Sequence, residues 1–186
     1  MYNRLNNYLD ANKIIVDNQY GFRKEHSTYM DLLKMINDIT NEQENKNYSQ
    51  GVFIDLSKAF NTVDHNILIK KMYHYRIRLI VLDWFTNYLC NRKQYVSINN
   101  VNSNMLPVAC GVPQGSILGS LLFILFINDI TSISKLAELI MFADDTKSIF
   151  FKHANISELF VNVNNELQKV SKWFKLNKLS LNIKKN

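Results

Sequence analysis

The chain has 186 residues, 47% of them hydrophobic and 12% aromatic, which allows a sizeable core and argues against a disordered protein. Lys and Arg outnumber Asp and Glu by 22 to 16, which is compatible with a polyanionic partner but does not establish one. Cys90 and Cys110 have no Cys or His near them at a zinc spacing, so we expect reduced thiols in a core.

The longest apolar run, residues 117–127, is too short to cross a bilayer. The N-terminal residues carry no apolar signal segment. We therefore expect an intracellular protein of the nucleus or cytoplasm, neither secreted nor bound to a membrane.

The first half of the chain predicts two helices and a strand. Residues 1–11 are typical of the end of a helix that buries Leu5 and Leu9. Ser27 or Thr28 can cap a second helix that runs to about Glu44. Its spacing predicts a buried stripe of Leu32, Leu33, Ile36 and Ile39. A polar connector over 41–50 then leads to a strand over 51–56.

The second half predicts further helices and two hairpins. Two helices are expected between Asp64 and Leu89, with Trp84 in the core, and a hairpin joins 94–99 to 105–110. The turn at 111–115 opens a buried helix over 117–127, and a periodic helix covers 157–177. We expect an α+β chain with interleaved elements and no separable domains.

Two adjacent carboxylates, Asp144 and Asp145, stand between β-prone arms at the tip of a predicted hairpin. Such a pair alone is more often a solvated turn than a metal site. Asp55, however, ends another predicted strand, and if the two strands are neighbours three carboxylates converge. Like charges at close range are unfavourable without a cation. Two Mg²⁺ ions would resolve the repulsion and support in-line displacement at phosphorus.

These segments resemble five motifs of the reverse transcriptases of non-LTR retrotransposons, jockey- and CR1-like elements in particular. Residues 52–65 are similar to the first catalytic motif, residues 111–119 to the second, and residues 142–145 to the third. Residues 19–28 resemble the fingers motif, and residues 179–185 the segment after the catalytic hairpin. Their shared order over nearly the whole chain makes the resemblance specific.

The resemblance implies the fingers and palm of a right-hand polymerase, with an antiparallel palm sheet, packed helices and no thumb. Within residues 1–186 it implies fingers over about 1–50, inserted parts over about 66–112, and palm over about 51–65 and 113–186. It implies an RNA-directed DNA polymerase that extends a DNA primer on an RNA template with dNTPs and two Mg²⁺ ions, which Mn²⁺ can replace. The expected protein is a truncated copy, with a catalytically silent nucleic-acid-binding remnant as the alternative.

The resemblance also implies residue roles. Asp55, Asp144 and Asp145 are the expected metal ligands and catalytic residues. The side chains expected at the nucleotide are Phe60 beneath the sugar, Gln114 and Gly115 against the nucleotide, and Arg23 with Lys24 on the phosphates. Lys185 is a possible general acid for the departing pyrophosphate.

Plainer interpretations compete with these roles. Phe60 alone would be read as core, Gly115 as the start of a helix, and Arg23 as a solvated charge. Asp64 and His65 fit the first motif but need only cap a helix. A two-metal nuclease could use the same carboxylates, although Phe60 and the 111–115 turn would have no evident task in it.

Overall fold

The computed structural model describes residues 1–23, 27–90, 92–113, 115–134, 136–142 and 146–182. Within these ranges no helix is both long and apolar enough to cross a membrane. The helices are α1 (Tyr2–Ala11), α2 (Thr28–Glu44), η1 (Ala59–Thr62), α3 (His65–His74), α4 (Ile80–Leu89), α5 (Ile117–Ile127), η2 (Asn128–Ser132) and α6 (Ile156–Leu176).

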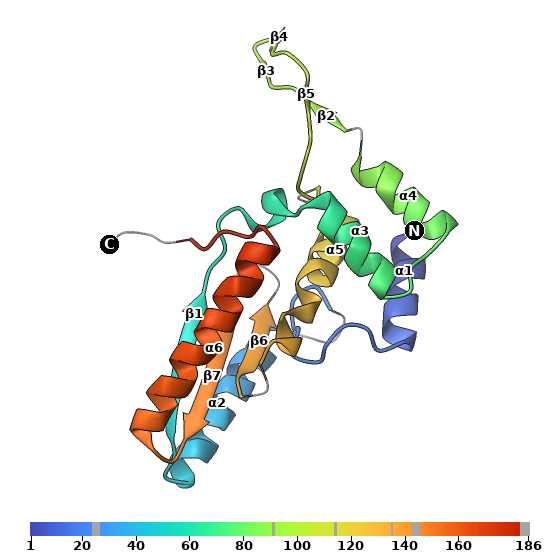
Figure 1. The fold of residues 1–186 in the computed structure, drawn as a ribbon. Coiled ribbons are helices and arrows are strands. Elements are labelled where there is room, and N and C mark those ends of the chain that lie inside the picture. Colours follow the sequence, from blue (N-terminus) through green and yellow to red (C-terminus); the bar gives the residue numbers. More distant parts are fainter. Residues whose placement is uncertain (24–26, 91, 114, 135, 143–145, 183–186) are drawn as a thin grey trace.

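An antiparallel sheet of three strands joins an early segment of the chain to a late one (Figure 1). β1 (Tyr48–Ile54) lies against β7 (Thr146–His153), which also pairs with β6 (Glu138–Phe142). The registers place Ile54 opposite Lys147 and Phe142 opposite Thr146. The predicted strand before Asp55 therefore lies beside the predicted hairpin, and the α+β class is confirmed.

The helix α6 covers one face of this sheet, and α2 lies across the other (Figure 1). Asn155 caps α6 by accepting hydrogen bonds from the backbone of Ser157 and Glu158. The predicted apolar stripe of this helix is confirmed, because Leu159, Val163, Val170 and Phe174 are buried and Leu167 is partly buried.

The stripe predicted for α2 is wrong. Leu32, Leu33 and Ile36 are 49%, 38% and 47% exposed, and only Ile39 among the four is partly buried. The helix instead turns charged side chains toward the sheet. Lys34 pairs with Glu138 of β6, and Glu42 pairs with Lys152 of β7 at 2.7 Å. These ion pairs to distant strands fix a different face of α2 against the sheet.

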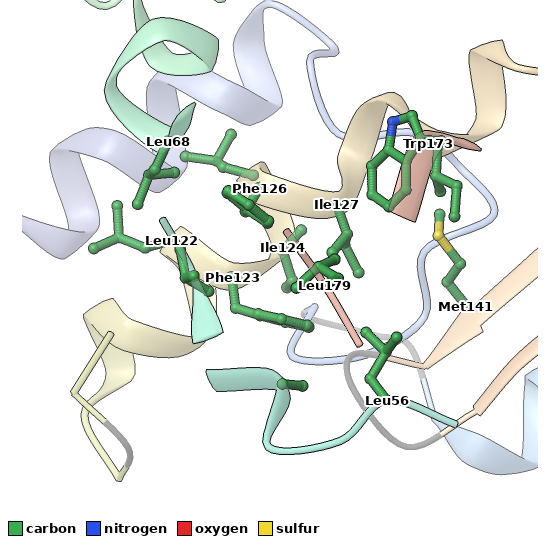
Figure 2. Packing of buried hydrophobic residues seen from close by; sticks show 14 of the residues in the cluster. Leu56, Leu68, Leu122, Phe123, Ile124, Phe126, Ile127, Met141, Trp173 and Leu179 are labelled. Atoms are coloured by element: carbon green, nitrogen blue, oxygen red, sulfur yellow. The ribbon is translucent and has the colours of Figure 1, made fainter. Parts of the chain in front are cut away.

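The core is centred on α5, where every residue from Leu121 to Ile127 is buried. The helix packs against α1, α3 and η1, and the buried Leu5, Leu9 and Leu68 belong to the same cluster. Figure 2 shows Phe123, Ile124 and Ile127 of α5 in one cluster with Leu56, Met141, Trp173 and Leu179. The core thus joins α5 to β6, to α6 and to the segments that follow β1 and α6.

A two-part hairpin projects away from this body (Figure 1). Its ladders are β2 (Lys93–Gln94) with β5 (Leu106–Pro107), and β3 (Ser97–Ile98) with β4 (Val101–Asn102). Asn99 and Asn100 both have positive φ, as a two-residue type I′ turn requires. The predicted hairpin is confirmed, with shorter arms and a tighter turn.

Three local predictions need correction. Trp84 is 38% exposed and stacks on Tyr88 at 5.3 Å, so it lies at the surface of α4. Both cysteines are free, but Cys110 is exposed and Cys90 only partly buried. The expected 41–50 connector is mostly taken up by α2 and β1.

Candidate active site

Asp55 stands one residue beyond the end of β1, with its side chain exposed. Ile54 pairs with Lys147, so Asp55 lies at the end of the sheet where the β6–β7 hairpin closes. Asp144 and Asp145 fall outside the described residues. Among the residues that the structure describes, no group of three His, Cys, Asp or Glu side chains could hold a metal ion.

The position of Asp55 nevertheless suits a hard cation. Its carboxylate is open to solvent and supplies oxygen donors, which Mg²⁺ prefers over nitrogen or sulfur. Its Oδ2 accepts a hydrogen bond of 2.6 Å from Nδ2 of Asn182. No cationic partner of Asp55 occurs among the ion pairs of the described residues.

Phe60 lies five positions after Asp55, in η1, which packs against α5. Its ring is 9% exposed and packs against Phe123 at 4.8 Å, with Phe22 at its edge at 6.5 Å. Its exposed edge lines an open pocket, whose other residues are Tyr2, Phe22, Gly115, Ser116, Ile117, Ser120 and Leu121. Phe60 is therefore both a core residue and part of a pocket wall.

The turn at 111–115 is tied to the chain after Asp55. Gly111 donates to the carbonyl of Val63 at 2.7 Å, and Val112 donates to that of Phe60 at 2.8 Å. The buried ring of His65 adds a third link, since its Nε2–H donates to the Gly111 carbonyl at 2.7 Å. Gly111 has φ of +89°, and a Cβ there would lie 2.9 Å from the carbonyl oxygen of Asn61. Three hydrogen bonds thus hold the segment after Asp55 against the start of the 111–115 turn.

Two further glycines lie in or beside this turn, and one of them, Gly115, lines the pocket. Gly119 lies directly under the turn, where a Cβ would come within 2.2 Å of the Pro113 carbonyl oxygen. Gly115 has φ of +83°, and a Cβ there would meet nothing within 4 Å. The space around Gly115 is therefore open, and the contact of this residue with a nucleotide stays a prediction. Gln114 lies outside the described residues.

Arg23 lies apart from this pocket. Its Nη1 donates to the carbonyls of Val16 at 3.0 Å and Gln19 at 3.3 Å. It borders a separate hollow beside α1, so the structure does not bring it together with Phe60 and Gly115. Lys24 and Lys185 fall outside the described residues, and their phosphate and proton-transfer roles stay predictions.

Asp64, at the start of α3, connects this helix to the segment after α6. Asp64 caps α3 as predicted, accepting from the Ile67 backbone at 3.0 Å. It also pairs with Lys178 at 2.7 Å, and this hydrogen-bonded cation lowers the pKa of the Asp64 carboxyl. Sequence reasoning missed the contacts of Lys178, Asn182 and His65. The available signal was that His65 and Asn182 lie inside matched motifs and that Lys178 directly precedes one.

One family model and several curated proteins are similar to this chain. A family model described as reverse transcriptase (RNA-dependent DNA polymerase) matches residues 1–186. The chain is 34% identical over 154 residues to the RNA-directed DNA polymerase from mobile element jockey of Drosophila melanogaster, covering 77% of this chain and 16% of that protein. It is 35% identical over 131 residues to the probable RNA-directed DNA polymerase from transposon BS of the same organism, covering 69% and 14%. It is 32% identical over 146 residues to that from transposon X-element, covering 76% and 16%. The chain thus spans only 14% to 16% of the length of these relatives.

Proposed function

Because this chain belongs to the reverse transcriptase (RNA-dependent DNA polymerase) family of nucleotidyltransferases, we propose that it adds deoxynucleotides to a DNA primer along an RNA template. One observation carries the proposal most directly. The exposed carboxylate of Asp55 lies at the hairpin end of the sheet. Phe60, five positions later in the chain, lines a pocket together with Gly115.

The proposed site holds two Mg²⁺ ions through Asp55, Asp144 and Asp145. Bound Mg²⁺ would activate the primer hydroxyl and neutralise the charge that develops on pyrophosphate. The protein's own contribution is to position oxygen ligands at a sheet end. Asp55 fits this task because its carboxylate is exposed and has no ion-pair partner among the described residues.

The proposed sugar site is the pocket that Phe60 lines. The Phe60 ring is held by Phe123 behind it, so the ring cannot retreat easily from a bulkier sugar. We propose that it excludes a 2′-hydroxyl and so favours deoxynucleotides. The open space at Gly115 would admit the incoming nucleotide.

The division into palm and fingers follows the same proposal. The sheet β1-β7-β6 with α5 and α6 would be the palm, and α1 and α2 would belong to the fingers. Gln114, Arg23 and Lys24 are proposed to contact the nucleotide, and Lys185 to protonate pyrophosphate. The proposed place of action is inside the cell.

The test is dNTP incorporation on an oligo(dT)-primed poly(rA) template with Mg²⁺, using the 186-residue chain. We expect Asp55→Ala to reduce incorporation by about a thousandfold or more, because a charged ligand at the reacting centre is lost. Asp83→Ala is the matched control, since Asp83 is an exposed carboxylate on α4.

Undiminished incorporation by Asp55→Ala would show that the site is assigned wrongly. Salt-sensitive binding of an RNA–DNA duplex by the parent chain, without any incorporation, would instead support nucleic-acid binding alone.

A further inference from the structure

Asn182 contacts the proposed metal ligand directly. Its Nδ2 donates to Oδ2 of Asp55 at 2.6 Å, across 127 positions of the chain. The backbone adds to this contact, because the Asn182 amide donates to the Asp55 carbonyl at 3.0 Å. Two separate hydrogen bonds therefore join the same pair of residues.

The segment that carries Asn182 is firmly held. Ser57 donates to the Ser180 carbonyl at 2.9 Å, and Leu56 forms an antiparallel bridge with Leu181. Leu179 is only 6% exposed and lies in the same apolar cluster as Leu56 (Figure 2). Asn182 is itself exposed, but backbone pairing and the burial of Leu179 hold the segment that carries it.

We propose that Asn182 is a positioning residue that fixes the rotamer of the Asp55 carboxylate for a divalent cation. The inference rests on the proposed function of Asp55. An amide N–H that occupies one side of Oδ2 restricts rotation of the carboxylate and leaves the other oxygen free for a cation. A neutral donor suits this position, because a Lys or Arg would compete with the cation for the same charge.

Hydrogen bonds to a ligating carboxylate typically contribute about 10- to 100-fold to metal affinity. Asn182→Leu removes the donor and keeps the number and branching of the side-chain heavy atoms, so we expect Mn²⁺ to bind about tenfold more weakly. The measurement is loss of the free Mn²⁺ electron paramagnetic resonance signal on titration, without nucleotide or template. Asp55→Ala identifies the part of the binding that depends on this site.

The matched control is Lys178→Met. It removes an anchor of the same segment, the ion pair to Asp64, but leaves the amide of Asn182 in place. We expect this variant to bind Mn²⁺ within about twofold of the parent, since it alters no group near the cation. Thermal unfolding in EDTA is followed for each variant, and we expect Asn182→Leu to keep a cooperative transition.

Parent-like affinity in Asn182→Leu would overturn the inference, and so would an equal loss in Lys178→Met. Absence of any Asp55-dependent Mn²⁺ binding in the parent would overturn it together with the metal site. Polymerase activity is a separate readout. A chain that incorporates no nucleotide but shows the expected order of Mn²⁺ affinities would refute the proposed function and support the role of Asn182.

Discussion

The candidate site has two walls that are built by different interactions. The pocket wall, made of Phe60 and residues 111–113 and 115–121, includes the start of α5 and is fixed by apolar burial and close glycine contacts. The sheet-edge wall, made of Asp55 and residues 178–182, is fixed mainly by hydrogen bonds and one ion pair near the surface.

Because of this difference, we expect the two walls to contribute differently to stability and to function. A substitution that changes side-chain volume in a close-packed region lowers the free energy of unfolding strongly, because the neighbouring atoms cannot move away. Exposed polar links contribute little free energy each, but they can fix the direction of a charged group. We expect variants of the pocket wall to unfold more easily, and substitutions of Asp55 or Asn182 in the sheet-edge wall to change function at nearly constant stability.

The largest loss of stability is expected for Gly119→Ala. The new methyl group would lie 2.2 Å from the Pro113 carbonyl oxygen, and neither backbone can move without breaking the Ser116 cap of α5. We expect the free energy of unfolding to fall by about 3 kcal/mol, measured by urea denaturation.

Gly115→Ala is the matched control for this prediction. It meets no atom within 4 Å and should cost only about 1 kcal/mol from its positive φ. Equal losses in the two variants would mean that the turn does not pack on α5 as described.

A smaller effect is expected for Phe60→Val, which lowers the wall of the pocket. The preference for dNTP over rNTP, measured as the ratio of their incorporation rates, should fall about tenfold, because the smaller side chain leaves space for a 2′-hydroxyl. Phe85→Val is the control, since Phe85 is fully buried and does not line this pocket. Unchanged discrimination in Phe60→Val at a temperature where the chain is folded would remove Phe60 from the sugar site.

The smallest effect is expected for Lys178→Met on the sheet-edge wall. Lys178 is 67% exposed, so loss of its ion pair with Asp64 should cost less than about 1 kcal/mol at pH 7. The pKa of Asp64 is lowered in the folded chain, so this contribution is present above the ordinary Asp pKa of about 4. It is lost as pH falls through the lower folded value.

Urea unfolding of the parent and of Lys178→Met at pH 7 and pH 3 tests whether the stability difference between them shrinks as the pH falls. Lys172→Met, at an exposed position of α6, is the control. A stability difference that grows toward pH 3 would contradict the assigned ion pair.

Sequence patterns predicted most elements because each depends on neighbours along the chain. The helix α5 is apolar all round, so it is buried however it turns. The helix α2 shows where this reasoning stops. Its apolar positions form a clear stripe, but its orientation depends on the pairing of Lys34 with Glu138, 104 positions away.

The candidate site divides in the same way. Motif order predicted roles for Asp55, Phe60 and Gly115, and the structure places the last two in one pocket. The link from His65 to Gly111 spans 46 positions and that from Asn182 to Asp55 spans 127, so neither is visible as a local pattern. Only the fold brings such pairs within hydrogen-bonding distance.

The pairing of β1 with β7, and of Asp55 with Asn182, also has a kinetic consequence. Both contacts close very long loops, whereas α3, α4 and α5 form from local turns and nearby packing. We therefore expect the helical part of the core to form first and the sheet end to close later. During synthesis, the surroundings of Asp55 cannot be completed until Asn182 has left the ribosome.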